Sequence, residues 1–130
     1  MKHLLVVYHS QTGNTAALAQ AVLRGASSDQ IEGVRVRLRR ASEAGSQDML
    51  WCHAVVLGTP ENFGYMSGAL KDFMDRTFYP SQGRVDGLPF AMLVSAGNDG
   101  SGALRTIRRI ASGYPLKEVQ APIIVRGPPS

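Results

Sequence analysis

The alternation between short apolar runs and stretches with helical spacing is the feature that most limits how this chain can fold. Apolar runs lie at about residues 3–8, 54–57 and 89–95. Each run is followed by a turn of small or polar residues and then by apolar residues three and four positions apart, the spacing of one helix face. This order predicts a parallel sheet whose connecting helices cover both faces, an α/β architecture with three layers.

The remaining elements follow from the same patterns. We expect further strands at residues 33–40 and 118–125, helices at residues 14–25, 67–78 and 103–112, and a short or loose helix within residues 42–50. The strand over residues 33–40 alternates valine or leucine with arginine, whereas strands inside a parallel sheet are apolar throughout. We therefore expect it at a sheet edge. Pro122 indicates an edge position or a bulge for the last strand, because proline cannot donate to a strand ladder. The helix over residues 67–78 has an apolar stripe that we expect to face the core: Met66, Ala69, Leu70, Phe73, Met74 and Thr77.

Length and composition restrict the class of protein. A chain of 130 residues suits one domain with one core, so we expect a single domain over residues 1–130. No apolar run approaches the ~20 residues that span a bilayer, and the chain begins directly with a strand pattern rather than a signal peptide. The one cysteine, Cys52, excludes an internal disulfide. These features predict a cytoplasmic protein.

The net charge of +4 reflects two clusters of arginine, at residues 35–40 and 105–109. A basic surface can attract nucleic acid or an anionic cofactor. The clusters contain no interleaved exposed aromatic residues, so we do not expect nucleic acid as a partner. A solvated basic face is the simpler interpretation.

The turn after the first strand has the composition of an anion site. It leads directly into the first helix and consists of Ser10, Gln11, Thr12, Gly13, Asn14 and Thr15. The first N–H groups of a helix have no partner within the helix, and the helix dipole favours an anion beside them. Hydroxyl groups in the turn can add donors. The turn contains no lysine or arginine, so a phosphate here would be held by neutral donors.

Other phosphate and metal sites do not fit the sequence. The G-x-x-x-x-G-K-[ST] motif of NTPases is absent, and no G-x-G-x-x-G follows the first strand. His3, His9 and His53 are scattered and are joined by no carboxylate cluster, so no metal site is expected. The turns after residues 8, 57 and 95 lie at one carboxyl edge of the predicted sheet, where ligands of such folds bind. We expect these turns to converge on one ligand.

Two segments resemble a known family. Residues 10–15 resemble the S/T-x-T-G-x-T phosphate loop of the flavodoxins, which bind flavin mononucleotide (FMN). Residues 58–68 and 70–76 resemble the flavodoxin-like NAD(P)H-dependent reductases, including quinone reductases of the tryptophan-repressor-binding-protein type, whose loop reads G-T-P-x-x-F-G-x-M. The resemblance implies a flavodoxin-like three-layer fold with a five-stranded parallel sheet of order 2-1-3-4-5.

The resemblance also implies where FMN would bind. Its phosphate would lie among residues 10–15, and its isoalloxazine ring between two walls. The first wall would contain Thr59, Pro60, Glu61, Asn62, Phe63 and Gly64. The second would contain Ser95, Ala96, Gly97, Asn98 and Asp99. Phe63 would lie against the ring. No catalytic acid or base is expected, because the flavin itself carries the chemistry.

The implied function is that of an NAD(P)H-dependent oxidoreductase that passes electrons through FMN to a quinone or another small acceptor. A flavodoxin-type electron carrier, or an FMN-binding protein without turnover, is the alternative. Carriers of this family are typically acidic, as the resemblance implies, whereas this chain is basic. The charge therefore favours the enzyme.

The C-terminus departs from the family pattern. Flavodoxin-like domains usually close with a fifth helix after the last strand, but residues 125–130 contain two prolines, which oppose a helix. The sheet beside the last strand would then lack part of its cover. We expect a partner subunit to cover it in a homo-oligomer, or the chain to be a shortened form of a longer protein.

Overall fold

A parallel β-sheet with the strand order β2-β1-β3-β5-β6 forms the centre of the computed structural model, which describes residues 1–28 and 30–126. The strands of this path are β1 (Lys2–Tyr8), β2 (Val34–Arg40), β3 (Ala54–Asn62), β5 (Pro89–Ala96) and β6 (Lys117–Glu118). A further strand, β7 (Ile123–Arg126), also pairs in parallel with β5. The predicted strand order is confirmed, and β2 lies at an edge as its alternating arginines predict.

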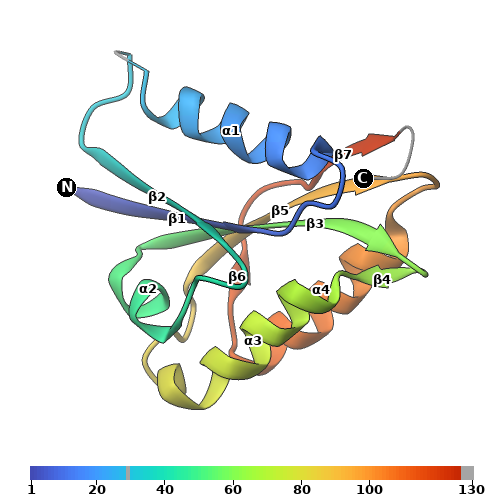
Figure 1. Cartoon of the computed structure of the whole chain (residues 1–130). Helices are drawn as coiled ribbons and strands as arrows, with labels where there is room; N and C mark the ends of the chain where they lie inside the picture. The colour runs from blue at the N-terminus through green and yellow to red at the C-terminus, as the bar shows by residue number, and fades with distance from the viewer. Residues whose placement is uncertain (29, 127–130) are drawn as a thin grey trace.

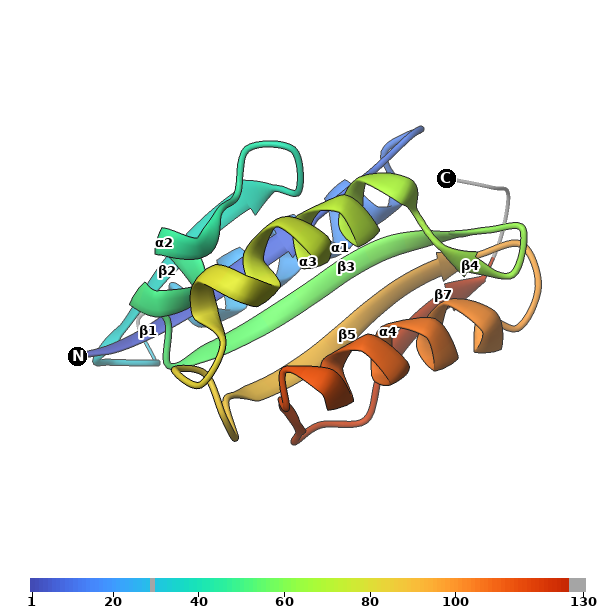
Figure 2. The same cartoon turned by 90° about the horizontal axis from the view of Figure 1, so that it is seen from below.

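Helices cover both faces of the sheet (Figure 1). The first helix, α1 (Asn14–Ala26), lies on one face. The other face carries α2 (Ser46–Trp51), α3 (Gly68–Ser81) and α4 (Ser101–Gly113). Seen from that side, α3 and α4 run next to each other across β3 and β5 (Figure 2). The three-layer α/β fold that the sequence predicts is therefore present.

The main core lies between the sheet and the pair α3 and α4. The stripe predicted on α3 faces this core: Met66, Leu70, Phe73, Met74 and Thr77 are buried, and Ala69 is partly buried. The Thr77 hydroxyl lies 2.9 Å from the Tyr114 hydroxyl at the end of α4, and the Tyr114 hydroxyl also donates to the Met74 carbonyl. These bonds satisfy the polar groups that the two helices bury between them.

Two segments differ from the sequence-based expectation. The strand expected at residues 54–57 continues to Asn62 and forms an antiparallel hairpin with β4 (Tyr65–Met66), where a loop was expected. Phe63 and Gly64 turn the hairpin with φ of 53° and 70°, the positive values that two-residue hairpin turns of type I′ require. The last strand is split into β6 and β7 around Pro122, which has no N–H for the ladder.

The last described strand has an open flank. No helix follows β7 within residues 1–28 and 30–126, and the prolines expected to oppose such a helix lie in residues 127–130, outside the described residues. Val119, Ile123 and Val125 are 54%, 49% and 42% exposed. The end of the sheet therefore presents apolar side chains to solvent.

The structure also bears on membrane spans, metal ligands and the cysteine. In the described part of the chain, no helix has the length and apolar character to cross a membrane. No group of three or more potential metal ligands occurs among the same residues. Cys52 is buried in the core as a small apolar residue, and this burial raises the pKa of its thiol to about 11.

Replacement of the central core residue should test this packing. Phe73→Ala removes a ring that is 1% exposed, and we expect a loss of about 3–5 kcal/mol in the free energy of unfolding. Phe63→Ala is the matched control, because the Phe63 ring lies in solvent, and its effect should stay within about 0.5 kcal/mol. Urea unfolding measures both. Equal effects of the two substitutions would contradict this description of the core.

Candidate functional site

Three segments that are far apart in the sequence meet at the carboxyl edge of the sheet. The segments lie at the carboxyl ends of β1, β3 and β5. These strands pair in parallel, so their carboxyl ends lie next to each other. The Thr15 and Ser95 hydroxyl groups lie 2.8 Å apart and join the first segment to the third. The segments thus meet at one edge, and their convergence on one ligand stays a prediction.

The first segment enters α1 through a glycine. Gly13 has φ of 109°, a conformation that side chains disfavour, and its N–H donates to the Ser10 hydroxyl at 3.1 Å. Gln11, Thr12, Gly13 and Asn14 are exposed, whereas Thr15 is buried. The N-cap glycine has no side chain to cap the helix, and the first turn of α1 contains no acidic residue. This helix start therefore faces solvent with a polar, uncharged loop around it.

Close packing holds the first segment against β3. A Cβ atom on Gly58 would lie 3.1 Å from the Cβ of Tyr8 and 3.4 Å from the Cγ2 of Thr15. Such distances are tighter than ordinary contacts, so glycine at this position allows the start of α1 to approach β3.

The second segment is the hairpin that β3 and β4 form. The Thr59 hydroxyl is buried, donates to the Pro60 carbonyl at 2.7 Å and accepts from the Ser67 N–H at 2.8 Å. Ser67 in turn caps α3 by accepting from the Leu70 N–H at 3.2 Å. Thr59 therefore ties the hairpin to the start of α3. Pro60 is also buried, which leaves Asn62, Phe63 and Gly64 nearer the open end of the hairpin.

Glu61 joins the hairpin to the start of α4. Its Oε2 atom accepts hydrogen bonds from the Gly102 and Ala103 N–H groups at 2.9 and 3.2 Å. An Oδ1 atom of Asp99 accepts from the Ser101 N–H and hydroxyl at 2.9 and 2.8 Å, and these bonds lower the pKa of Asp99. Two carboxylates thus occupy the start of α4, where a bound anion would meet like charge. The start of α1 has no such carboxylate.

Backbone contact brings the hairpin still closer to α4. A Cβ on Gly102 would lie 2.1 Å from the carbonyl oxygen of Gly64, a distance that no side chain tolerates. The Thr106 hydroxyl, one turn later, accepts from the Met66 N–H at 3.3 Å. Figure 2 shows β4 beside the first turn of α4. The hairpin and the start of α4 are therefore packed as one body.

The third segment is the end of β5 together with the turn that leads to α4, and its residues differ in exposure. Ser95 and Ala96 are buried at the end of β5, whereas Gly97, Asn98 and Asp99 are exposed between β5 and α4. Phe63 is fully exposed at the tip of the hairpin. Every residue expected at the site thus lies at this edge, but the fully buried Thr15, Thr59 and Ser95 make hydrogen bonds inside the protein.

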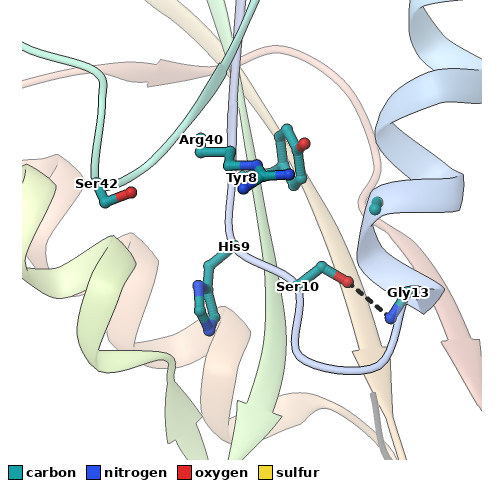
Figure 3. Close-up of a pocket in the computed structure, with 7 residues that line it drawn as sticks. Tyr8, His9, Ser10, Gly13, Arg40 and Ser42 are labelled. Atoms are coloured by element: carbon teal, nitrogen blue, oxygen red, sulfur yellow. Dashed lines mark hydrogen bonds between the residues drawn. The ribbon is translucent and has the colours of Figure 1, made fainter.

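A pocket of about 360 Å³ adjoins the first segment on the side of β2 (Figure 3). It is lined by Tyr8, His9, Ser10, Gly13, Ala16, Arg40 and Ser42. The sequence analysis predicts Ser10 and Gly13 at the site but not Arg40 or Ser42. Both residues could have been predicted from the strand order, because the carboxyl end of β2 lies at the same edge and Arg40 pairs in register with Tyr8.

The chemistry of these groups suits a phosphorylated ligand with a flat ring. The start of α1 offers N–H and hydroxyl donors without a competing carboxylate. The hairpin and the end of β5 offer backbone, small side chains and one exposed aromatic ring. The donor set contains no cluster of metal ligands within the described residues. The residues present therefore fit FMN.

Comparison with known proteins adds an independent finding. A protein family described as NADPH-dependent FMN reductase matches residues 39–123. A flavodoxin of Aquifex aeolicus is 37% identical over 102 residues, which cover 78% of this chain and 54% of that protein. An NAD(P)H dehydrogenase (quinone) of Acidithiobacillus ferrooxidans is 30% identical over 128 residues, with 82% and 63% covered. The chain thus spans only about half to three fifths of these curated relatives.

Solved structures share the fold. An archaeal flavodoxin superposes with a TM-score of 0.78 at 23% identity and covers 95% of this chain and 84% of its own. A WrbA-like flavodoxin protein of Agrobacterium tumefaciens superposes with a TM-score of 0.74 at 20% identity and covers 100% and 86%. At these identities the likeness concerns the arrangement of strands and helices.

The contact between Gly102 and Gly64 can be tested with two glycine-to-alanine substitutions that should change the free energy of unfolding in opposite directions. Gly102→Ala should force the hairpin away from α4 and lower the free energy of unfolding by about 1–3 kcal/mol. Gly25→Ala, in α1, meets nothing within 4 Å and should stabilise the protein by up to about 1 kcal/mol, since alanine restricts the unfolded chain. Thermal unfolding measures both variants. A stabilising Gly102→Ala would show that the hairpin is not packed as described.

Proposed function

We propose that this chain, which belongs to the NADPH-dependent FMN reductase family, binds FMN at the carboxyl edge of its sheet and works as an NAD(P)H-dependent oxidoreductase. One observation carries the placement of the cofactor. The segment that leads into α1 carries neutral donors, and the first turn of α1 contains no acidic residue, whereas Glu61 and Asp99 occupy the start of α4. A phosphate dianion is favoured at the first position and repelled at the second.

The phosphate group would be held by the segment from Ser10 to Thr15. The N–H groups at the start of α1 and the hydroxyl groups of Ser10 and Thr12 would donate to it, and the positive φ of Gly13 turns the backbone into the helix. Thr15 lies beneath this segment with its hydroxyl near that of Ser95. We propose that Thr15 orients the loop from below and contributes to binding through its backbone.

The ring system would lie between the hairpin and the segment after β5. Asn62, Phe63 and Gly64 form one wall of this proposed site, and Gly97 and Asn98 belong to the other. When bound, FMN supplies the electron chemistry, accepting and passing on electrons at its ring. The chain's own contribution is to position the ring. Glu61 fixes the hairpin by its bonds to α4, and the exposed Phe63 ring can cover an apolar face of the flavin.

The donor and acceptor are part of the proposal. The family description names NADPH, and one relative is an NAD(P)H dehydrogenase (quinone). We propose NAD(P)H as donor and a quinone or another small molecule as acceptor. A cytoplasmic location would suit this donor. An electron carrier is the second candidate, because another relative is a flavodoxin. The net charge of +4 favours the enzyme over an acidic carrier.

We also propose that the chain forms a homo-oligomer through the flank beside β7. Val119, Ile123 and Val125 are exposed at this end of the sheet, and exposed apolar side chains favour association. Sedimentation of the FMN-loaded protein distinguishes the states. A monomer that remains stable with FMN bound would overturn this part of the proposal without affecting the cofactor site.

A titration with FMN tests the cofactor site. The purified protein should be yellow or should bind added FMN, and Thr12→Ala should weaken binding about 10- to 150-fold, since a hydrogen bond to a charged group contributes roughly 1.5–3 kcal/mol. Ser112→Ala, at the far end of α4, is the control and should leave the affinity unchanged. A protein that binds no FMN would refute the proposal.

Reduction of the bound flavin separates enzyme from carrier. Under anaerobic conditions, NADPH or NADH should bleach the flavin absorbance, and addition of a quinone should restore it. Chemical reduction with dithionite is the control that shows the flavin can be reduced at all. Flavin that dithionite bleaches and neither nicotinamide bleaches would favour the carrier.

A further inference from the structure

The pocket beside β2 contains a cation that the FMN proposal does not use. Arg40 lines this pocket together with Ser10 and Gly13 of the phosphate segment and Ser42 of the following loop. Figure 3 shows Arg40, Tyr8 and Ser42 among the residues that line this pocket. The phosphate segment itself contains no cation, so Arg40 is a positive charge supplied to it by a neighbouring strand.

The sheet fixes the position from which Arg40 extends. Arg40 is the last residue of β2 and pairs in register with Tyr8, the last residue of β1. The Ala41 N–H then donates to the Tyr8 carbonyl at 2.7 Å, which extends the ladder one residue further. The Arg40 backbone also accepts from the Glu43 and Ala44 N–H groups at 2.9 and 3.0 Å. The base of the side chain is therefore held firmly at the edge of the pocket.

Two other arginines of β2, Arg37 and Arg39, already have acidic partners. Arg37 donates to Asp48 at 3.0 Å and lies over the Trp51 ring at 4.0 Å. Arg39 lies 3.8 Å from the same carboxylate. Among the residues that the structure describes, no carboxylate lies within ion-pair distance of Arg40. Its donors are therefore available to a ligand in the pocket.

We propose that Arg40, with the Ser10 and Ser42 hydroxyl groups, binds a phosphomonoester. This inference rests on the proposed FMN function and adds a charged contact to it. A guanidinium presents parallel N–H donors that match two phosphate oxygens, and hydroxyl groups can donate to a third. A monoester dianion gains more from a cation than a diester does, because it carries the larger charge.

Two phosphomonoesters could supply this chemistry. One is the 5′-phosphate of FMN, which would reach the pocket because Ser10 and Gly13 belong to both the pocket and the phosphate segment. The other is the 2′-phosphate of NADPH, which NADH lacks. The two sources make different predictions, because the first makes Arg40 a determinant of FMN over riboflavin and the second a determinant of NADPH over NADH.

Neutralisation of Arg40 tests the proposal. We expect Arg40→Gln to weaken binding of the relevant phosphate compound roughly three- to tenfold at low salt, with a smaller difference at high salt because the side chain is exposed. Arg40→Lys should restore part of the affinity. Arg35→Gln is the matched control, since Arg35 is exposed on the same strand but pairs in register with His3 at the opposite end.

Direct binding measurements then identify the source. Weaker FMN binding with unchanged riboflavin binding assigns Arg40 to the cofactor phosphate. Weaker NADPH binding with unchanged NADH and FMN binding assigns it to the donor. The inference is overturned if Arg40→Gln and Arg35→Gln give the same affinities for FMN and NADPH, or if riboflavin and NADH lose as much as their phosphorylated counterparts.

A titration with inorganic phosphate keeps this inference separate from the proposed function. The Arg40 side-chain Nε–Hε resonance, assigned by its loss in Arg40→Gln, should shift on addition of phosphate even if the protein binds no flavin. A protein without flavin affinity would refute the proposed function, whereas an unchanged Arg40 resonance would refute the phosphate pocket.

Discussion

The bonds between the Glu61 carboxylate and the first N–H groups of α4 determine the shape of the whole edge. They join the hairpin that extends β3 to the helix that follows β5, and the contact between Gly64 and Gly102 leaves no space for a side chain between the two. They also place a negative charge at the start of α4. An anionic ligand is thereby directed to α1, the other helix start at this edge, and the proposed division between a phosphate end and a ring end follows from this one interaction.

Most of the fold could be predicted because it depends on patterns within single segments. The apolar runs of β1 and β5, the alternating arginines of β2 and the stripe on α3 each indicate burial locally, and parallel connection then restricts the strand order. The hairpin at residues 59–66 could not be predicted in the same way. Its turn requires positive φ at Phe63, which is an unusual residue there, and the strain is accepted because Glu61 and Met66 are held by α4.

The candidate site was predictable in its location and less so in the roles of its residues. Hydroxyl residues at positions 10–15 indicate a phosphate segment, yet the pattern does not reveal that Thr15 is buried against Ser95. Glu61 belongs to the motif that suggested a ring wall, and its carboxylate is directed to a helix 40 residues later in the chain. Arg40 was missed because its relation to Tyr8 depends on strand register rather than on proximity in sequence.

The two outer boundaries of the sheet are both poor templates for adding another strand. On one side, β2 carries arginines at alternate positions, and charged side chains on an edge oppose pairing with a further chain. On the other, Pro122 divides the boundary into pieces of two and four residues, too short for a continuous ladder. Strand exchange and fibre growth through backbone hydrogen bonds are thus disfavoured at both ends. Any association between copies would have to use side chains, so its strength would depend on apolar area and shape.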